Sequence, residues 1–404
     1  MLAPTIRQLV KATAPVLKEH GVALTRHFYA RMFEHNPELK PIFNQGHQQS
    51  GSQQQALAMA VAAYAENIED PSVLAPVLTR IANKHVSLGI RAEHYPIVGQ
   101  HLLASIREVL GAEAATDELI AAWAAAYGQL ADALIGQESG LYTEAASLAG
   151  GWTGWRGFKV VRKRLESEEI MSLHLQPADG GGVPLYRPGQ YTSVRVFVPA
   201  LGMVQPRQYS LSAAPGAKTL RISVKRESAG ELTPAGWVSN VLHDGVNEGD
   251  LLDLAPPMGE FFLHEDRSTP VVLISGGVGV TPMMAMLDHL LQQGSSREIR
   301  FIHACRHGGV HAFKAHVAHL LAEHPNLRAA VHYEQPRVED VIGAGHDRIG
   351  RIDLSVLGEL ILLPEADYYL CGPLPFMQTQ AQSLKSLGVP ADRIHMEVFG
   401  TGGA

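Results

Sequence analysis

Apolar residues recur at helical spacing through the first third of the chain. Leu24, Phe28 and Met32 lie on one such stripe, and a period near 3.6 residues is typical of helices that bury one face. Proline and glycine stand mainly at the breaks, and "TDE" at 116–118 has the N-cap residue and first-turn acids that begin many helices. The pattern predicts an all-α domain over residues 1–148.

The pattern changes after this region. Residues 149–156 contain two tryptophans among glycines and are expected to form a linker. Residues 157–265 contain short β-rich runs such as IMSLHLQP and QYTSVRVFVP, which glycine- and proline-rich turns separate. Short strands at regular spacing favour an antiparallel barrel or sandwich. One polar tract further back, QQSGSQQQ at 48–55, is expected to be a loop that leads into a helix.

The last part of the chain, residues 266–404, alternates between strand and helix patterns. VVLISG, IRFIHACR and LRAAVHYE are apolar strand patterns, and TPMMAMLDHLLQQG and AFKAHVAHLLAEHP are helical ones. Such alternation predicts a doubly wound parallel sheet covered by helices. The sequence therefore predicts a multidomain protein in three parts: all-α, then antiparallel β, then α/β.

Composition and charge exclude some classes of protein. The 404 residues carry a net charge of −7, so an extended nucleic-acid or anionic-membrane surface is not expected. Two cysteines far apart form no disulfide framework. No signal-peptide pattern opens the chain, and no run approaches 18 apolar residues, so no membrane span and a cytoplasmic location are expected.

A glycine-rich loop follows the first strand of the α/β part. In GGVGVTP, Gly276, Gly277 and Gly279 allow the backbone to approach a ligand, and the helix that follows offers free N–H groups to a pyrophosphate. The spacing is not GxGxxG, and a tight strand-to-helix turn without a ligand is an equally good reading of this loop alone.

Three further motifs accompany the loop. In RQYS, Arg207 is suited to pair with a phosphate and Tyr209 to cover a flavin ring. CGP at 371–373 ends a later strand, where an α/β sheet has its ligand crevice, and EVFG lies at 397–400. Each motif alone has an ordinary structural explanation, such as a strand tyrosine for Tyr209. The four motifs together and in this order indicate a flavin- and nucleotide-binding module more specifically than any one of them alone.

In these motifs residues 152–404 resemble the ferredoxin–NADP reductase superfamily. The resemblance implies that the β domain binds FAD and that the α/β domain binds NAD(P)H. Thr401 stands where a proline is usual, and the chain ends soon after it. The cofactor-binding residues that the resemblance implies are Tyr191, Arg207, Gln208, Tyr209, Ser210 and Ser239 for FAD, Gly276, Gly277, Val278, Gly279, Val280 and Thr281 for the nucleotide, and Glu397, Val398, Phe399 and Gly400 beside the flavin.

The helical domain contains a candidate metal ligand, His85, in the stretch IANKHVSLGI. A histidine on an apolar helix face is more often a satisfied core residue, and this chain has 20 histidines. A fused flavin reductase needs an electron acceptor, however, and haem held through a histidine is a one-electron acceptor suited to helices. An axial histidine also needs an acceptor for its second ring nitrogen, and Tyr95 and Glu138 are candidates.

The opposite face of such a haem would need apolar walls and a hydrogen-bond donor. Phe28, Tyr29 and Phe43 are candidates, together with Gln53 and Leu57, which are spaced i,i+4 and share a helix face. Taken singly, the aromatic residues are by default core residues and Gln53 is by default solvated.

The segments HFYARMFEHNPELKPIFN, QQQALA and IANKHVSLGIRAEHYPIVGQHLL closely resemble the globin domain of bacterial flavohaemoglobins. With the reductase behind them, the resemblance covers essentially the whole chain. It implies haem b with His85 as the proximal iron ligand and Tyr95 and Glu138 as its hydrogen-bonded relay. It also implies that Tyr29 stabilises bound oxygen. The remaining pocket residues that it implies are Phe28, Phe43, Gln53, Leu57 and Lys84, the last tuning haem–flavin coupling together with Glu397.

The activity that the resemblance implies is nitric oxide dioxygenation. NAD(P)H reduces FAD, FAD reduces the haem one electron at a time, and the ferrous haem with O2 converts nitric oxide to nitrate. Tyr29, Tyr95 and Glu138 would be the catalytic residues. A gas-binding carrier or sensor, and a plain flavin or ferric reductase with a vestigial helical domain, are the alternative functions.

Several properties stay open at this stage. Arg306, after the second α/β strand, leans towards acceptance of NADPH, but the sequence does not decide between NADH and NADPH. A monomer with no obligatory protein partner is expected, and lipid in the haem pocket is a further expectation.

Overall fold

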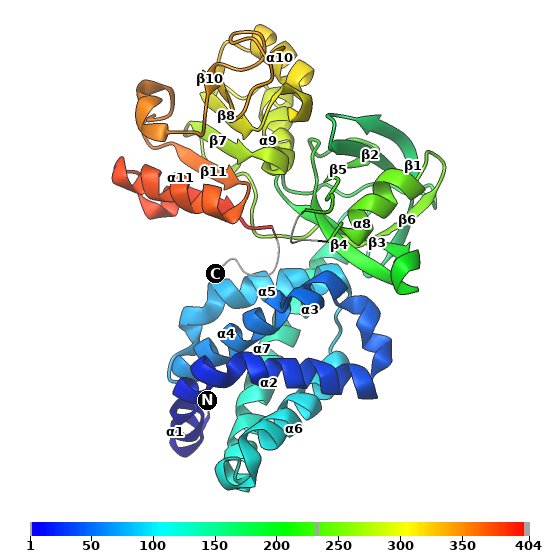
Figure 1. Ribbon diagram of the computed structural model, residues 1–404, viewed down its shortest axis with the longest axis vertical. Coiled ribbons are helices and arrows are strands. Elements are labelled where there is room, and N and C mark those ends of the chain that lie inside the picture. The colour runs from blue at the N-terminus through cyan, green and yellow to red at the C-terminus, as the bar shows by residue number, and fades with distance from the viewer. Residues whose placement is uncertain (1, 231–233, 400–404) are drawn as a thin grey trace.

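The computed structural model describes residues 2–230 and 234–399, which form three domains in chain order (Figure 1). The first domain is helical and occupies one end of the molecule, and the other two lie side by side at the opposite end. The helices of the first domain are α1 (Pro4–Ala12), α2 (Ala14–His35), η1 (Pro37–Ile42), α3 (Gln45–Ser50), α4 (Ser52–Glu66), η2 (Pro71–Leu74), α5 (Ala75–Leu88), α6 (His94–Ala114) and α7 (Asp117–Ser147).

Local signals fix the ends of the helices that matter for the site. Thr116 is the N-cap of α7, as predicted, and its Oγ1 accepts a hydrogen bond from the Leu119 N–H at 3.2 Å. Gly89 ends α5 with φ 77°, a conformation that glycine adopts without steric cost. This stop leaves His85 in the last turn of α5.

The expectation of a loop over residues 48–55 is wrong. The tract is helical on both sides of one break, because α3 runs to Ser50 and α4 begins at Ser52. Gly51, with φ 79°, makes the break. Glutamine is a good helix former, so its polarity does not predict a loop. Gln53 is therefore in the first turn of α4.

The second domain is a six-stranded antiparallel sheet. Its strands are β1 (Arg156–Leu165), β2 (Ile170–Pro177), β3 (Tyr191–Val198), β4 (Met203–Ser210), β5 (Leu220–Lys225) and β6 (Leu251–Leu254), in the order β4-β3-β6-β1-β2-β5. The outer strands meet where Leu211 pairs with Ile222, and the Ser212 N–H donates to the Arg221 carbonyl at 2.8 Å. The sheet is therefore a closed barrel around apolar side chains such as Phe158 and Leu173.

The third domain has a six-stranded parallel sheet. Its strands are β7 (Val271–Gly276), β8 (Ile299–Cys305), β9 (Leu327–Tyr333), β10 (Arg348–Ile349), β11 (Asp367–Cys371) and β12 (Ile394–Glu397), in the order β10-β9-β8-β7-β11-β12. The connecting helices are α9 (Val280–Gln292), α10 (Lys314–Glu323) and α11 (Leu374–Ser386). Since β8 and β11 flank β7, the chain reverses its direction across the sheet at β7, which is where such folds bind ligands.

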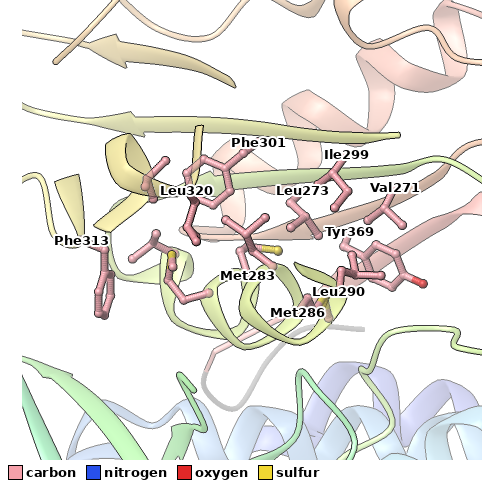
Figure 2. Close-up of a cluster of buried hydrophobic side chains, with 14 of the residues drawn as sticks. Val271, Leu273, Met283, Met286, Leu290, Ile299, Phe301, Phe313, Leu320 and Tyr369 are labelled. Atoms are coloured by element: carbon pink, nitrogen blue, oxygen red, sulfur yellow. The ribbon is translucent and has the colours of Figure 1, made fainter. Parts of the chain in front are cut away.

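A buried cluster holds α9 under this sheet. Figure 2 shows Met283 of α9 directed at Leu273 and Phe301 of the strands, in one cluster with Met286 and Leu290. All five side chains are at most 4% exposed. Burial of this extent fixes where α9 begins, and with it the position of the glycine loop.

The helical domain packs on the barrel through α5. Val86 of α5 forms a small core with Ala145 of α7 and Met258 of the barrel domain. Between the domains, α7 ends at Ser147 and β1 begins at Arg156, and Trp152 anchors the intervening segment by donating to the Leu254 carbonyl at 3.1 Å. The helix that carries His85 is therefore also in direct contact with the second domain.

Within the described ranges, one helix has the length and apolar composition of a membrane-crossing segment. An 18-residue window of α7 has mean hydropathy 1.3. The sequence expectation concerned uninterrupted apolar runs, and Gln129 and Asp132 interrupt this helix, so the expected lack of a membrane span stays a prediction. The apolar residues Ala122, Trp123 and Leu134 of α7 are packed inside the helical domain, and a core helix also has this composition.

Candidate functional site

His85 lies at the centre of a three-residue network. Its Nδ1 lies 2.7 Å from Glu138 Oε1 and 3.1 Å from the Tyr95 hydroxyl, which in turn donates to the same carboxylate oxygen. The three residues come from α5, α6 and α7, and Tyr95 and Glu138 are buried. An ionised Glu138 accepts hydrogen bonds only, so Nδ1 carries the proton and Nε2 has a free lone pair.

The phenol in this network stays protonated. Burial, the hydrogen bond to Glu138 and the charge of Glu138 all raise the pKa of Tyr95. A neutral Tyr95 donates its proton to the carboxylate, which therefore interacts with two donors at once. This arrangement fixes the tautomer and orientation of the imidazole, as in carboxylate–histidine–metal sites.

A second group of predicted residues surrounds Tyr29 on α2. Its ring lies 4.9 Å from the ring of Phe28 and 5.7 Å from the ring of Phe43, centroid to centroid. Burial raises the pKa of Tyr29, and the nearby Gln53 amide opposes this rise in part. Gln53 and Leu57 are both half-buried on α4. The region is therefore an apolar environment that contains one phenol and one amide.

These residues fit a haem rather than a bare metal ion. In the described part of the chain, no group of three or more His, Cys, Asp or Glu residues is suited to hold a metal, so His85 would need a prosthetic group to supply the other ligands. Gln53 Oε1 is buried and has no hydrogen-bond partner among the described residues. A lone pair at His85 Nε2 and an unsatisfied amide oxygen suit a haem with a bound polar ligand.

Two cationic side chains, Lys84 and Arg207, and the neutral imidazole of His47 lie near one another between the helical domain and the barrel. Burial lowers the pKa of Lys84 and of Arg207, and burial with the charges of Arg207 and Lys84 lowers the pKa of His47 to about 4. No described carboxylate pairs with Lys84 or Arg207 within 4.0 Å. Two half-buried positive charges of this kind suit an anion such as a cofactor phosphate or carboxylate. His47 was not predicted, because it is one polar residue in a polar tract.

Hydrogen bonds tie α5 and its neighbours to the barrel. Gln208 Nε2 donates to Ser87 Oγ at 2.9 Å, and the Gly259 N–H donates to Asn83 Oδ1 at 3.0 Å. Arg80 also pairs with Glu260 at 3.0 Å. Asn83 and Ser87 were not predicted as site residues, since nothing in their local sequence indicates a partner more than 100 residues away.

The RQYS motif lies on β4 opposite β3. In the register of the two strands, Tyr209 pairs with Thr192 and Ser210 with Tyr191. Burial raises the pKa of Tyr209 and, with the charge of Glu397, the pKa of Tyr191. Neutral buried phenols of this kind suit contact with an aromatic cofactor.

Ser239 lies apart from this pair, in α8 (Trp237–Asn240). Its Oγ accepts from the Glu227 N–H and donates to the Gly236 carbonyl, both at 3.2 Å. The hydroxyl therefore stabilises its own loop, and its place near an FAD phosphate stays a prediction.

The glycine loop and the CGP motif are in direct contact. Gly276 ends β7, Gly277–Gly279 form the turn, and α9 begins at Val280. A Cβ on Gly279 would lie 2.1 Å from the Cys371 carbonyl oxygen, so only glycine fits there. Thr281 Oγ1 donates to the Val278 carbonyl at 3.0 Å and closes the first turn. The loop thus places the N-terminus of α9 at the crevice.

Glu397 lies near the meeting point of all three domains. β12 pairs with β11 so that Glu397 is opposite Cys371. Burial and the charge of Glu260 raise the pKa of Glu397 to about 8, and Arg80 of α5 opposes this rise. Val398 follows it and the Phe399 side chain is exposed; Gly400 and Thr401 lie outside the described residues. The structure brings Glu397 towards Tyr191 and α5, which sequence spacing alone does not predict.

We expect Glu397 to make stability depend on pH. The folded protein binds this proton more tightly than the unfolded chain, so the free energy of unfolding falls as pH rises from 4.5 towards about 8, then levels off. Glu397→Gln should lack this fall. Denaturant unfolding at a series of pH values measures it. The exposed Glu359→Gln is the control and should behave as the wild type; equal pH slopes in all three proteins would contradict the prediction.

Fold and site together define a globin joined to an NAD-binding oxidoreductase module. The globin family profile matches residues 26–134, and the oxidoreductase NAD-binding domain profile matches residues 273–382. The chain is 66% identical over 404 residues to the flavohemoprotein of Bordetella parapertussis, covering 100% of both chains. It is 64% identical over 401 residues to that of Chromobacterium violaceum, covering 99% of each. The chain belongs to the flavohemoprotein family, as its sequence resemblance predicted.

Solved structures agree in architecture. Flavohemoglobin from Malassezia yamatoensis, whose crystal structure contains FAD and heme, matches with a TM-score of 0.85 and 30% identity over 99% of this chain and 100% of that one. The FAD/NAD-binding domain of nitric oxide dioxygenase from Vibrio cholerae matches with a TM-score of 0.55 and 43% identity over 61% of this chain and 98% of its own. The predicted order of globin, FAD-binding barrel and NAD-binding α/β domain is confirmed.

Proposed function

We propose that this protein is an NAD(P)H-dependent nitric oxide dioxygenase that converts nitric oxide and O2 to nitrate. The observation that carries the proposal is the His85–Glu138–Tyr95 network on the helix that docks on the barrel. In this network the Glu138 carboxylate makes the imidazole of His85 a stronger electron donor. The helix that carries His85 also contacts the proposed flavin-binding domain directly. The Vibrio cholerae protein, whose reductase domain is similar to this one, is named a nitric oxide dioxygenase.

Three cofactors follow from the residues present. His85 would hold haem b, with Phe28, Phe43, Gln53 and Leu57 around it; β4 and Tyr191 would hold FAD; and the loop from Gly276 to Thr281 would hold NAD(P)H. Bound haem supplies one-electron iron chemistry towards O2 and nitric oxide, and FAD divides the electron pair of a hydride into single electrons.

The residues of the chain contribute orientation, proton donation and charge. Glu138 accepts a hydrogen bond from the Nδ1–H of His85 and makes the imidazole a stronger electron donor at Nε2. Tyr29, kept neutral by burial, would donate a hydrogen bond to negative charge on an oxygen substrate. Lys84 and Arg207 offer positive charge to cofactor anions between the domains, and Phe28 and Phe43 keep water from the reacting groups.

The residues that would bind FAD and those that would bind haem lie close together, which would favour electron transfer between the cofactors. Gln208 of the predicted flavin motif contacts Ser87, two residues after His85. Glu397 of the α/β domain lies near the same region, since its charge acts on Tyr191 and the charge of Arg80 acts on it. We also propose a monomer without an obligatory protein or nucleic-acid partner and a cytoplasmic location; lipid in the haem pocket is a further proposal.

Replacing Tyr29 with phenylalanine tests the function. The variant loses the donor to developing charge, and we expect nitrate formation per NADH to fall by about tenfold to a hundredfold, with faster O2 release. Nitrate is measured against NADH consumed after anaerobic reduction and addition of O2 and nitric oxide.

The matched control is Tyr64→Phe. Tyr64 is a buried tyrosine of the same domain, and its hydroxyl donates to the Ala126 carbonyl at 3.0 Å. It should retain nitrate formation. A wild type that binds O2 but forms no nitrate would indicate a carrier or sensor, and a purified yellow protein without a Soret band would indicate a plain flavin reductase.

A further inference from the structure

The turn between β1 and β2 docks on the α/β domain through two acidic residues. Glu169 pairs with Arg306, and Glu168 makes two hydrogen bonds to Arg337, at 2.6 and 2.8 Å. The Glu168 N–H also donates to the Gly309 carbonyl at 2.9 Å. Two acidic residues of the barrel domain therefore pair with two arginines of the α/β domain.

The arginines lie where a dinucleotide has its adenosine ribose. Arg306 follows β8 directly, and Arg337 follows β9, so both stand at the carboxyl edge of the sheet. β8 is the neighbour of β7, whose end carries the glycine loop. In doubly wound domains the residue after the second strand contacts the ribose, an acid taking a 2′-hydroxyl and an arginine a 2′-phosphate.

Both arginines are already paired with carboxylates. The Arg306 and Arg337 side chains are 56% and 41% exposed, so a ligand can reach them. A 2′-phosphate would gain a bidentate arginine partner but would also meet two negative charges from the barrel domain. A coenzyme without that phosphate meets no such repulsion.

Gly309 allows this close approach. A Cβ at this position would lie 2.1 Å from Glu168 Oε1 and 2.7 Å from Arg337 Nη1. The Glu168–Arg337 pair therefore packs directly on the backbone of the loop after β8. The pairing is a built contact between two domains rather than a chance meeting of long side chains.

We propose that Glu168 and Glu169 determine coenzyme preference by occupying the two arginines that would otherwise bind the 2′-phosphate of NADPH. The wild type then prefers NADH although Arg306 stands at a position that favours NADPH. The proposal rests on the proposed function in one respect, namely that the loop from Gly276 to Thr281 binds NAD(P)H.

The test compares Glu168→Gln/Glu169→Gln with the wild type in the holoenzyme. The rate of anaerobic flavin reduction is measured with NADH and with NADPH. We expect the ratio of kcat/KM for NADPH to that for NADH to rise about tenfold or more, since two repulsive charges leave and two arginines become free. Adding Arg306→Ala to this variant should return the ratio towards the wild-type value.

Asp179→Asn is the matched control. Asp179 makes a similar pair of hydrogen bonds to Arg156, at 2.8 and 2.7 Å, beyond the opposite end of the same β1–β2 hairpin. Its ratio should equal that of the wild type. A second measurement titrates the proteins with 2′,5′-ADP and with 5′-AMP, and only the former should bind more tightly to the double glutamine variant.

An unchanged NADPH-to-NADH ratio in the double variant overturns the proposal, as does a gain that survives Arg306→Ala. Normal flavin reduction without nitrate formation overturns the proposed function alone, because flavin reduction needs neither haem nor nitric oxide. A wild type whose flavin neither coenzyme reduces overturns both.

Discussion

His85→Ala is expected to yield a protein with flavin absorbance and no Soret band. Glu138 and Tyr95 orient the imidazole of His85 through its Nδ1, and in the proposed function its removal would leave the haem iron without a protein ligand. We expect nitric-oxide-dependent NADH consumption to fall by about a hundredfold or more, which is the scale expected when an essential cofactor ligand is lost. Flavin reduction by NADH should persist, since the glycine loop and the RQYS strand belong to other domains.

The control for this variant is His20→Ala. The His20 side chain is 59% exposed in the same domain, so its loss should leave the Soret band intact. Absorbance spectra, pyridine haemochrome content and NADH consumption measure the result. Retention of a full haem complement by His85→Ala would show that another residue holds the iron.

Gly279→Ala is expected to abolish reduction by NAD(P)H while leaving haem binding intact. The added Cβ would lie 2.1 Å from the Cys371 carbonyl oxygen and 2.7 Å from the Gly372 nitrogen, and both are backbone atoms of a buried strand end. Neither atom can move without displacing β11 or the start of α9. Overpacking of this kind costs about 1–3 kcal/mol or more, and here it also displaces the N–H groups that would hold a pyrophosphate.

Gly128→Ala is the comparison for this change. Gly128 lies in α7, and a Cβ there would meet no atom within 4 Å, so stability should be equal or slightly higher. Stopped-flow flavin reduction and denaturant unfolding measure both variants. Wild-type hydride transfer in Gly279→Ala would mean that the close contact of the glycine loop with Cys371 has no role in coenzyme binding.

The sequence patterns predicted the architecture well because they report local periodicity. The run IMSLHLQP coincides with β2 (Ile170–Pro177), and VVLISG with β7 (Val271–Gly276). The candidate residues His85, Tyr95 and Glu138 follow partly from the family resemblance, and the structure brings all three within hydrogen-bonding distance. Their roles stay predictions until the variants are measured.

What the sequence did not predict depends on contacts between distant segments. His47, Asn83 and Ser87 become candidate site residues only because the barrel lies against the helical domain. From the sequence, Arg306 leans towards acceptance of NADPH, but the structure pairs it with Glu169, which is 137 residues away. Periodicity and composition contain no information about such pairs, since these depend on how the domains pack.

Helix α5 connects the proposed iron ligand and the barrel in one rigid element. His85 points towards Glu138, whereas Asn83 and Ser87, two residues to either side, bond to the barrel. Successive residues of an α-helix are rotated by about 100°, so opposite faces of one helical turn serve the two contacts. An insertion or deletion of a single residue within this turn would rotate the proposed iron ligand, His85, relative to the helix face that contacts the barrel. The spacing of Asn83, His85 and Ser87 is therefore a constraint on which lengths of this segment natural variation can tolerate.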